Sequence, residues 1–84
     1  MKTPDSVFDL NNDGEEDMRL FLEPEGQDFW LPPGKTVQVR LFGADRPIVM
    51  KYSTGPDGEP QVSFWPENGD YELIFEGRDV WDLV

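Results

Sequence analysis

The sequence has no histidine and no cysteine, and it has few basic residues. Its 84 residues include 18 acidic and 7 basic side chains, which gives a formal net charge of −11. Serine–histidine and thiol catalysis therefore lack their usual groups, as do structural zinc and copper sites. The acidic excess is the reverse of a nucleic-acid-binding surface, and it would repel anionic membranes. We therefore expect a protein that is not an enzyme and that binds neither nucleic acid nor membranes directly.

Two further absences bear on the compartment. Without cysteine there is no disulfide framework, so nothing in the composition indicates an oxidising environment. Residues 1–13 contain no apolar run typical of a signal peptide, and no stretch of the sequence is apolar and long enough to span a bilayer. The sequence therefore predicts a cytoplasmic location.

The length and the apolar content are those of one small domain. The chain is 37% hydrophobic and 13% aromatic, enough for one modest core. In the first seventeen residues, however, the sizeable apolar side chains after Met1 are only Val7, Phe8 and Leu10. We therefore expect residues 1–17 to form an acidic leader or loop, and residues 18–84 to form a single all-β domain.

Apolar and polar residues alternate from Met18 onward, and a period of two is typical of strands with one buried face. The residues expected on the buried faces are, in chain order, Met18, Leu20, Leu22, Val37, Val39, Leu41, Ile48, Met50, Tyr52, Val62, Phe64, Tyr71, Leu73, Phe75 and Val80. No window has a convincing helical period, and the eight prolines and eight glycines disfavour long helices. The pattern predicts an all-β fold, a small antiparallel sandwich or partly open barrel of six or seven strands.

Turn residues separate these runs at regular spacing. Pro32-Pro33-Gly34 suits a type II turn, in which the glycine takes a positive φ. Pro56-Asp57-Gly58 is expected to close a hairpin, and Asn68-Gly69 is the strongest short hairpin signal. Pro24-Glu25-Gly26 and Gly77 mark two more turns.

The segment from Phe29 to Val39, FWLPPGKTVQV, is similar to the strand–turn–strand entry of many immunoglobulin-like and cupredoxin-like domains. With its LPPG turn and the later Trp65-Pro66 step, the domain also resembles short uncharacterised bacterial β proteins. The copper function of cupredoxins does not carry over, because their histidine and cysteine ligands are absent here.

The acidic segment from Asp9 to Asp17 has a pattern with a defined chemistry. It reads D-x-N-x-D-G-x-x-D, and calcium is bound by six to eight oxygens that such a tight loop can supply. The spacing resembles the calcium loops of FG-GAP and VCBS-type propeller repeats. By that resemblance, Asp9, Asn11, Asp13 and Asp17 would be side-chain ligands and Glu15 would supply a backbone carbonyl.

A plainer interpretation of the same segment stays open. Propeller repeats come in arrays, whereas this chain has one copy of the motif, and an EF-hand would need a glutamate where Leu20 stands. The alternative is a solvated acidic leader in which Asn12-Asp13-Gly14 forms a turn. No cofactor other than calcium is suggested.

Several aromatic residues are out of phase with the expected core. Trp30 alternates with Phe29 and Leu31, and Phe21 falls between Leu20 and Leu22. Such residues lie under loops, follow a register-shifting bulge, or form an apolar patch for a partner. The candidate partner-binding residues are Trp30, Phe42, Trp65 and Trp81.

The leading expectation for function is a non-catalytic protein-interaction module whose partner has a basic surface. Two alternatives belong to different classes: a calcium-binding domain, and an acidic inhibitor that mimics nucleic acid with its carboxylates.

Overall fold

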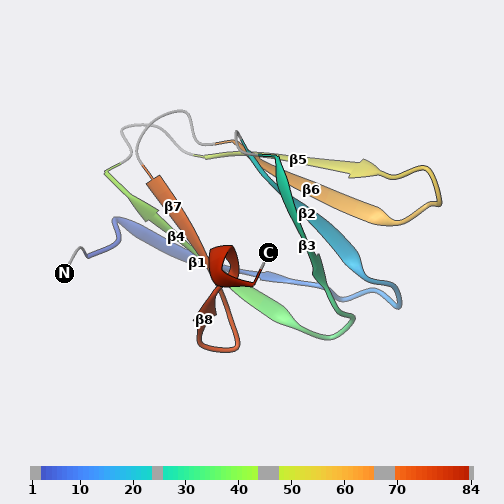
Figure 1. The fold of residues 1–84 in the computed structure, drawn as a ribbon, viewed down its shortest axis with the longest axis horizontal. Coiled ribbons are helices and arrows are strands. Elements are labelled where there is room, and N and C mark those ends of the chain that lie inside the picture. Colours follow the sequence, from blue (N-terminus) through green and yellow to red (C-terminus); the bar gives the residue numbers. More distant parts are fainter. Residues whose placement is uncertain (1–2, 24–25, 44–47, 66–69, 84) are drawn as a thin grey trace.

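The part of the chain that the structure describes forms eight strands and one short 3-10 helix. The computed structural model describes residues 3–23, 26–43, 48–65 and 70–83 (Figure 1). In chain order the elements are β1 (Ser6–Asn11), β2 (Met18–Leu22), β3 (Gln27–Leu31), β4 (Thr36–Phe42), β5 (Val49–Thr54), β6 (Pro60–Trp65), β7 (Asp70–Phe75), β8 (Arg78–Asp79) and η1 (Val80–Asp82).

The strands form two four-stranded sheets that pack face to face. Sheet A has the order β1-β4-β7-β8, and sheet B has the order β3-β2-β6-β5. All the pairs are antiparallel except β2 with β6, which run parallel. The predicted all-β fold is confirmed as a sandwich. The described residues form eight strands where six or seven were expected, and one pair is parallel where all were expected to be antiparallel.

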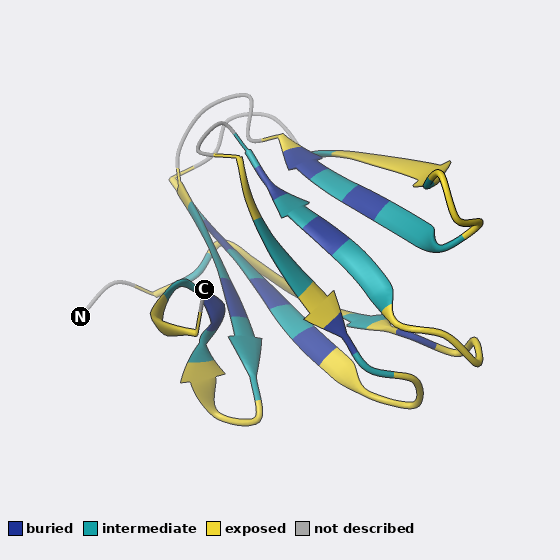
Figure 2. Cartoon of the chain, turned by 45° about the vertical axis from the view of Figure 1, so that its right-hand side comes forward, coloured by how far each residue is buried: buried dark blue, intermediate teal, exposed yellow. Residues whose placement is uncertain are grey.

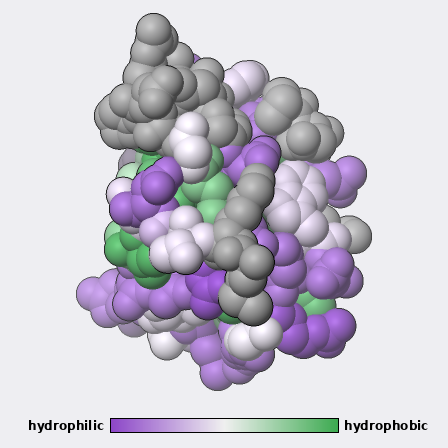
Figure 3. Space-filling view, turned by 90° about the vertical axis from the view of Figure 1, so that its left-hand side faces the viewer, coloured by the Kyte–Doolittle hydropathy of each residue, from purple (hydrophilic) through white to green (hydrophobic). Residues whose placement is uncertain are grey.

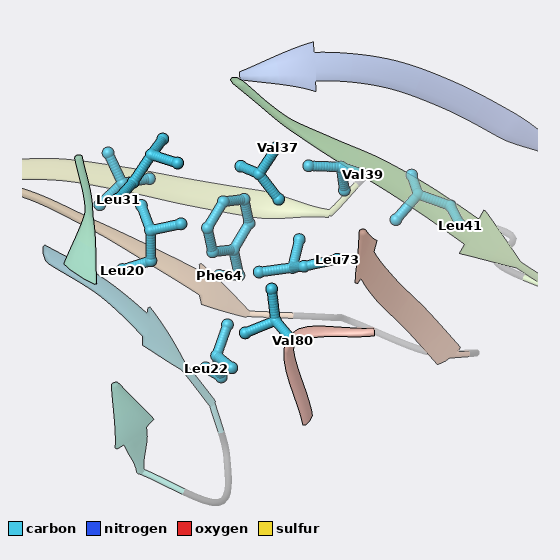
Figure 4. Packing of buried hydrophobic residues seen from close by; sticks show 10 residues of the cluster. Leu20, Leu22, Leu31, Val37, Val39, Leu41, Phe64, Leu73 and Val80 are labelled. Carbon is cyan, nitrogen blue, oxygen red and sulfur yellow. The ribbon is translucent and has the colours of Figure 1, made fainter. Parts of the chain in front are cut away.

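The core lies between the inward faces of the two sheets. Phe64 of β6 is fully buried at its centre, with Leu20 on the sheet B side and Leu73 on the sheet A side (Figure 4). Along β4 and β6 buried residues alternate with less buried ones, as a period of two requires (Figure 2). The other buried apolar residues are Leu22, Leu31, Val37, Val39, Leu41, Val62 and Val80.

Aromatic contacts join the sheets at one side of the sandwich. The rings of Phe29 and Phe75 are 5.2 Å apart between centroids, and the ring of Tyr71 stacks on that of Phe64 at 6.2 Å. The Tyr71 hydroxyl donates a hydrogen bond to the backbone carbonyl of Glu23 at 3.1 Å. Such pairs stabilise a core by about 0.5–1.5 kcal/mol beyond the area that they bury.

The N-terminal segment corrects the expectation of a leader. Ser6–Asn11 form β1, an edge strand that pairs with β4 along its whole length. Phe8 and Leu10 face inward and pack against the core. Three apolar residues in this segment do not by themselves predict a strand. An edge strand, however, needs only one apolar face, and two inward side chains provide that face.

Most of the turn assignments agree with the structure. Gly34 has a φ of 77°, and the Lys35 N–H donates to the Pro32 carbonyl at 3.2 Å, as in the predicted type II turn. Glu76 and Gly77 have φ values of 51° and 81° and form the two-residue turn between β7 and β8. The Pro56-Asp57-Gly58 turn joins β5 to β6, as predicted.

Two expectations for the C-terminal half of the chain are wrong. Asn68-Gly69 lie outside the described residues, but the strands on either side of them, β6 and β7, belong to different sheets and form no hairpin. Val80 is buried as expected, but it starts the helix η1 rather than lying in a strand. Asp79 caps this helix by accepting a hydrogen bond from the Trp81 N–H at 2.9 Å.

Strand β5 has the expected phase but not the expected burial. Met50 and Tyr52 lie opposite the buried residues Phe64 and Val62, so their side chains share the inward face of sheet B. Nevertheless Met50 is 46% exposed and Tyr52 is 71% exposed, and the prediction that they belong to the core is wrong. In the ribbon view β5 extends beyond the strands of sheet A (Figure 1).

Among the described residues no helix has the length and the apolar character needed to cross a membrane.

A matched pair of valines tests which face of sheet A is buried. Val39→Ala should lower the free energy of unfolding by about 2 kcal/mol, because it removes fully buried methyl groups and leaves a cavity. Val7→Ala on neighbouring β1 should cost less than about 0.5 kcal/mol, because Val7 is 50% exposed. Urea unfolding measures both values, and equal losses would contradict the register of β1 against β4.

Candidate functional site

The outer face of sheet B carries a cluster of aromatic and cationic side chains. Arg19 of β2 lies directly opposite Trp30 of β3, and Phe21 lies opposite Asp28. These residues alternate with the buried Leu20, so they point away from the core. Trp30 is 45% exposed.

Arg19 is held at the middle of this cluster. Its Nε and Nη2 atoms donate hydrogen bonds to Oδ2 of Asp28 at 2.9 and 2.6 Å. Its guanidinium carbon lies 4.3 Å from the ring centroid of Phe21 and 5.5 Å from that of Trp30, both within cation–π range. The ion pair and the two rings give the guanidinium one geometry, so a partner would not have to order this side chain on binding.

Trp65 lies on the same face at the other end of the sheet. It is 42% exposed and stands opposite Val49, while Lys51 of β5 stands opposite Ser63. Gln61 of β6 pairs with Arg19, and Trp65 follows it by four residues. From ordinary strand dimensions, the backbones of Trp30 and Trp65 are about 16 Å apart. The two indoles thus lie apart from each other on the same face and do not touch.

The other two predicted partner-binding residues lie elsewhere. Phe42 of β4 is half-buried on the outer face of sheet A, opposite Asp70 of β7. Trp81 of η1 is half-buried and packs against the core, with its ring 6.4 Å from that of Tyr71. The structure therefore brings together Trp30 and Trp65 on one face, but neither Phe42 nor Trp81 joins them.

The partner-binding candidates chosen from the sequence did not include Arg19 and Phe21, although the alternation along β2 already indicated the face on which they lie. Both alternate with Met18, Leu20 and Leu22, and that phase alone places them on the outer face. Their contact with Trp30 depends on the pairing of β2 with β3, and the alternation does not specify that register.

The acidic segment proposed to bind calcium is organised around a buried asparagine. Asn12 is 1% exposed, and its Nδ2 donates to the carbonyls of Glu16 and Leu31 at 2.8 and 2.9 Å. Its Oδ1 accepts from the Gly14 N–H at 3.1 Å. The Asn12 backbone also pairs with Gly34 and Lys35. This residue therefore fastens the loop after β1 to the type II turn before β4.

The five predicted calcium ligands are exposed and spread over two elements. Asp9 and Asn11 lie on the outer face of β1, where Asn11 Oδ1 accepts a hydrogen bond from the Thr36 hydroxyl at 2.9 Å. Asp13, Glu15 and Asp17 belong to the loop that follows. Within the described ranges, no three histidine, cysteine, aspartate or glutamate side chains gather closely enough to hold a metal ion. Calcium binding stays a prediction from the sequence pattern alone.

Among the described residues, the carboxyl group of Glu59 has a shifted pKa. Backbone hydrogen bonds, from its own N–H first and also from Asp57, lower the pKa of Glu59 in the β5–β6 turn, and a side-chain bond from Gln61 acts in the same direction. A lowered pKa means that this stabilisation is complete above the ordinary glutamate pKa and is lost as the pH falls through the lowered value. The contribution of Glu59 is therefore present at neutral pH.

The side of the molecule shown in Figure 3 has hydrophilic and apolar areas among the described residues. On the outer face of sheet B, the exposed indoles of Trp30 and Trp65 lie on the same face as Arg19, and these residue types are enriched at the energetic centres of protein interfaces.

No protein-family model matches the chain, and no curated protein or solved structure matches it at a significant level. The proposals that follow are based on the geometry and the chemistry of this chain.

Two adjacent asparagines test how the acidic loop is built. Asn12→Ala should lower the free energy of unfolding by about 2–3 kcal/mol, because it leaves the buried Leu31 carbonyl without its side-chain donor. Asn11→Ala should cost less than about 0.5 kcal/mol, since Asn11 is exposed. Thermal and urea unfolding of both variants measure the difference. If Asn12→Ala were as stable as Asn11→Ala, this description of the loop would fail.

Proposed function

We propose that this protein is a non-catalytic protein-interaction module and that it binds its partner through the outer face of sheet B. The proposal depends chiefly on one observation, the Arg19 guanidinium held by Asp28 against the rings of Phe21 and Trp30. Tryptophan and arginine are the residues most enriched among those that dominate interface energies.

This arrangement favours binding because its side chains need little further ordering when a partner binds. An exposed arginine normally loses rotamer freedom on binding, at a cost of about 0.5–1.5 kcal/mol. Here the ion pair and the two rings already restrict Arg19. Trp30 and Trp65 project from paired strands of a sheet, which is a more rigid support than a loop.

The charge of the chain suggests the character of the partner. Arg19 and Lys51 lie on the outer face of sheet B, whereas the chain as a whole carries a net charge of −11. A partner would cover the aromatic centre with apolar side chains, and a basic surface on it would complement the net negative charge of the chain. That charge would increase the association rate and the selectivity more than the affinity. A cytoplasmic location belongs to the same proposal.

Matched aromatic truncations test this surface. Trp30→Ala and Trp65→Ala should each weaken partner binding by about 2 kcal/mol, roughly thirtyfold, because each removes an apolar anchor. Phe42→Ala, on the other sheet, is the control and should bind like the unchanged protein. Proteins captured by the unchanged chain and lost with both tryptophan variants would be identified, and their affinities measured at low and high salt.

Two results would contradict the proposal. The first is binding that survives both tryptophan truncations while circular dichroism shows the variants folded. The second is binding that falls steeply with salt and with charge reversal at Glu15 and Glu16 but does not depend on Trp30 or Trp65. That pattern would instead indicate a carboxylate mimic of nucleic acid, because surface charges are screened beyond about 8 Å at physiological ionic strength.

A further inference from the structure

The inward side of strand β5 is not covered by sheet A. Ile48, just before the strand, packs against the core, Met50 is 46% exposed and Tyr52 is 71% exposed. The exposure therefore rises along β5 as the strand leaves the sandwich (Figure 2). Met50 and Tyr52 have the register of core residues, opposite Phe64 and Val62, but lack a covering layer.

Strand β5 is also an edge of sheet B. Among the described residues it forms strand pairs only with β6, which leaves its other side as a sheet edge. Proteins usually protect such edges with short strands, proline or inward-pointing charges. Edge strand β8 has only two residues, and the inward side chains of edge strands β1 and β3, such as Phe8 and Phe29, pack against the core. The inward side of β5 is more exposed, and its charged residue, Lys51, lies on the outer face, opposite Ser63.

An acidic pocket adjoins the exposed end of β5. It has a volume of about 310 Å³ and is lined by Gly14, Glu15, Glu16, Tyr52, Gly58 and Pro60. Two carboxylates from the loop after β1 thus lie beside an aromatic ring from β5 and the tip of the β5–β6 hairpin. Carboxylates attract a lysine or arginine by charge, and a tyrosine ring adds a cation–π contact.

We propose that β5 is a docking edge for an extended basic segment of a partner protein, which adds to sheet B as a fifth strand. Main-chain hydrogen bonds to β5 would supply much of the affinity, and side chains at alternate positions would supply the selectivity. One inward side chain of the segment covers Met50, and the next inward side chain enters the pocket beside Tyr52, Glu15 and Glu16. Because the strand period is two, the segment carries an apolar residue and a lysine or arginine two positions apart.

Charge selects this occupant over a second copy of the chain. Two copies would each bring a net charge of −11 to the contact, and pairing β5 with another β5 would bring the acidic pockets of both copies to one interface. A basic segment removes that repulsion. The docking edge uses the inward side and the free edge of β5, whereas the proposed function uses the outer face of sheet B, so either can fail without the other.

Synthetic peptides of about eight residues test the docking edge, since β5 itself has six. The probe has threonine at every second position, with valine and lysine at the positions between, and it carries a fluorophore. Its first control replaces lysine by glutamate, and its second carries N-methyl groups that block strand pairing. Fluorescence anisotropy at low salt gives the affinities, and amide NMR shifts in Val49–Thr54 locate the bound peptide. The protein variants are Tyr52→Ala, Glu15→Gln with Glu16→Gln, and, as the control, Val7→Ala on exposed β1 of the other sheet.

We expect the lysine probe to bind and to shift the β5 amides. Tyr52→Ala should weaken its binding about threefold to fivefold, and the double glutamine variant about tenfold, whereas Val7→Ala should leave it unchanged. Both control peptides should bind at least about tenfold more weakly. Three results would overturn the proposal: no binding of the lysine probe, equal binding of the N-methylated peptide, or a β5-mediated dimer of the protein in sedimentation.

Discussion

The parallel pairing of β2 with β6 determines where the other strands of sheet B lie. It aligns Leu20 with Val62 and Leu22 with Phe64, so that four apolar side chains enter the core from adjacent strands. The hairpin partner of β2 must then lie on one side, and the hairpin partner of β6 on the other. Strand β5 thereby becomes an edge, and the residues between the core positions form one continuous outer face.

Both proposed surfaces are consequences of that arrangement. On the outer face, the register places Arg19 between Trp30 and Gln61, which gives the guanidinium its aromatic neighbours. On the inward face, the sheet extends beyond sheet A, so Met50 and Tyr52 meet solvent instead of a second layer. One sheet thus presents an ordered aromatic face and an unpaired edge, the two features by which β proteins commonly recognise other chains.

The acidic loop has a structural role that its composition concealed. Six acids in the first seventeen residues suggest a solvated leader, but Asn12 anchors the loop through two donated hydrogen bonds and one accepted one. This anchoring positions Glu15 and Glu16 beside the β5–β6 hairpin. A buried amide with all these partners is favourable because its desolvation is compensated, whereas an unpaired one would cost about 1–3 kcal/mol.

The sequence by itself determined the fold class, most of the buried faces and several turns, because these depend on local properties. Alternation of apolar and polar residues identifies the inward face of a strand such as β4, and Gly34 supplies the positive φ that its turn requires. Only the tertiary structure decided which strands are neighbours, since strand pairing joins residues far apart in the chain. For this reason the sequence did not predict strand β1, and the hairpin predicted at Asn68-Gly69 does not form between β6 and β7. For the same reason Tyr52 is exposed, although its position in the alternation is that of a core residue. A side chain is buried when another layer covers it, and the extent of that layer is not encoded in the alternation of its own strand.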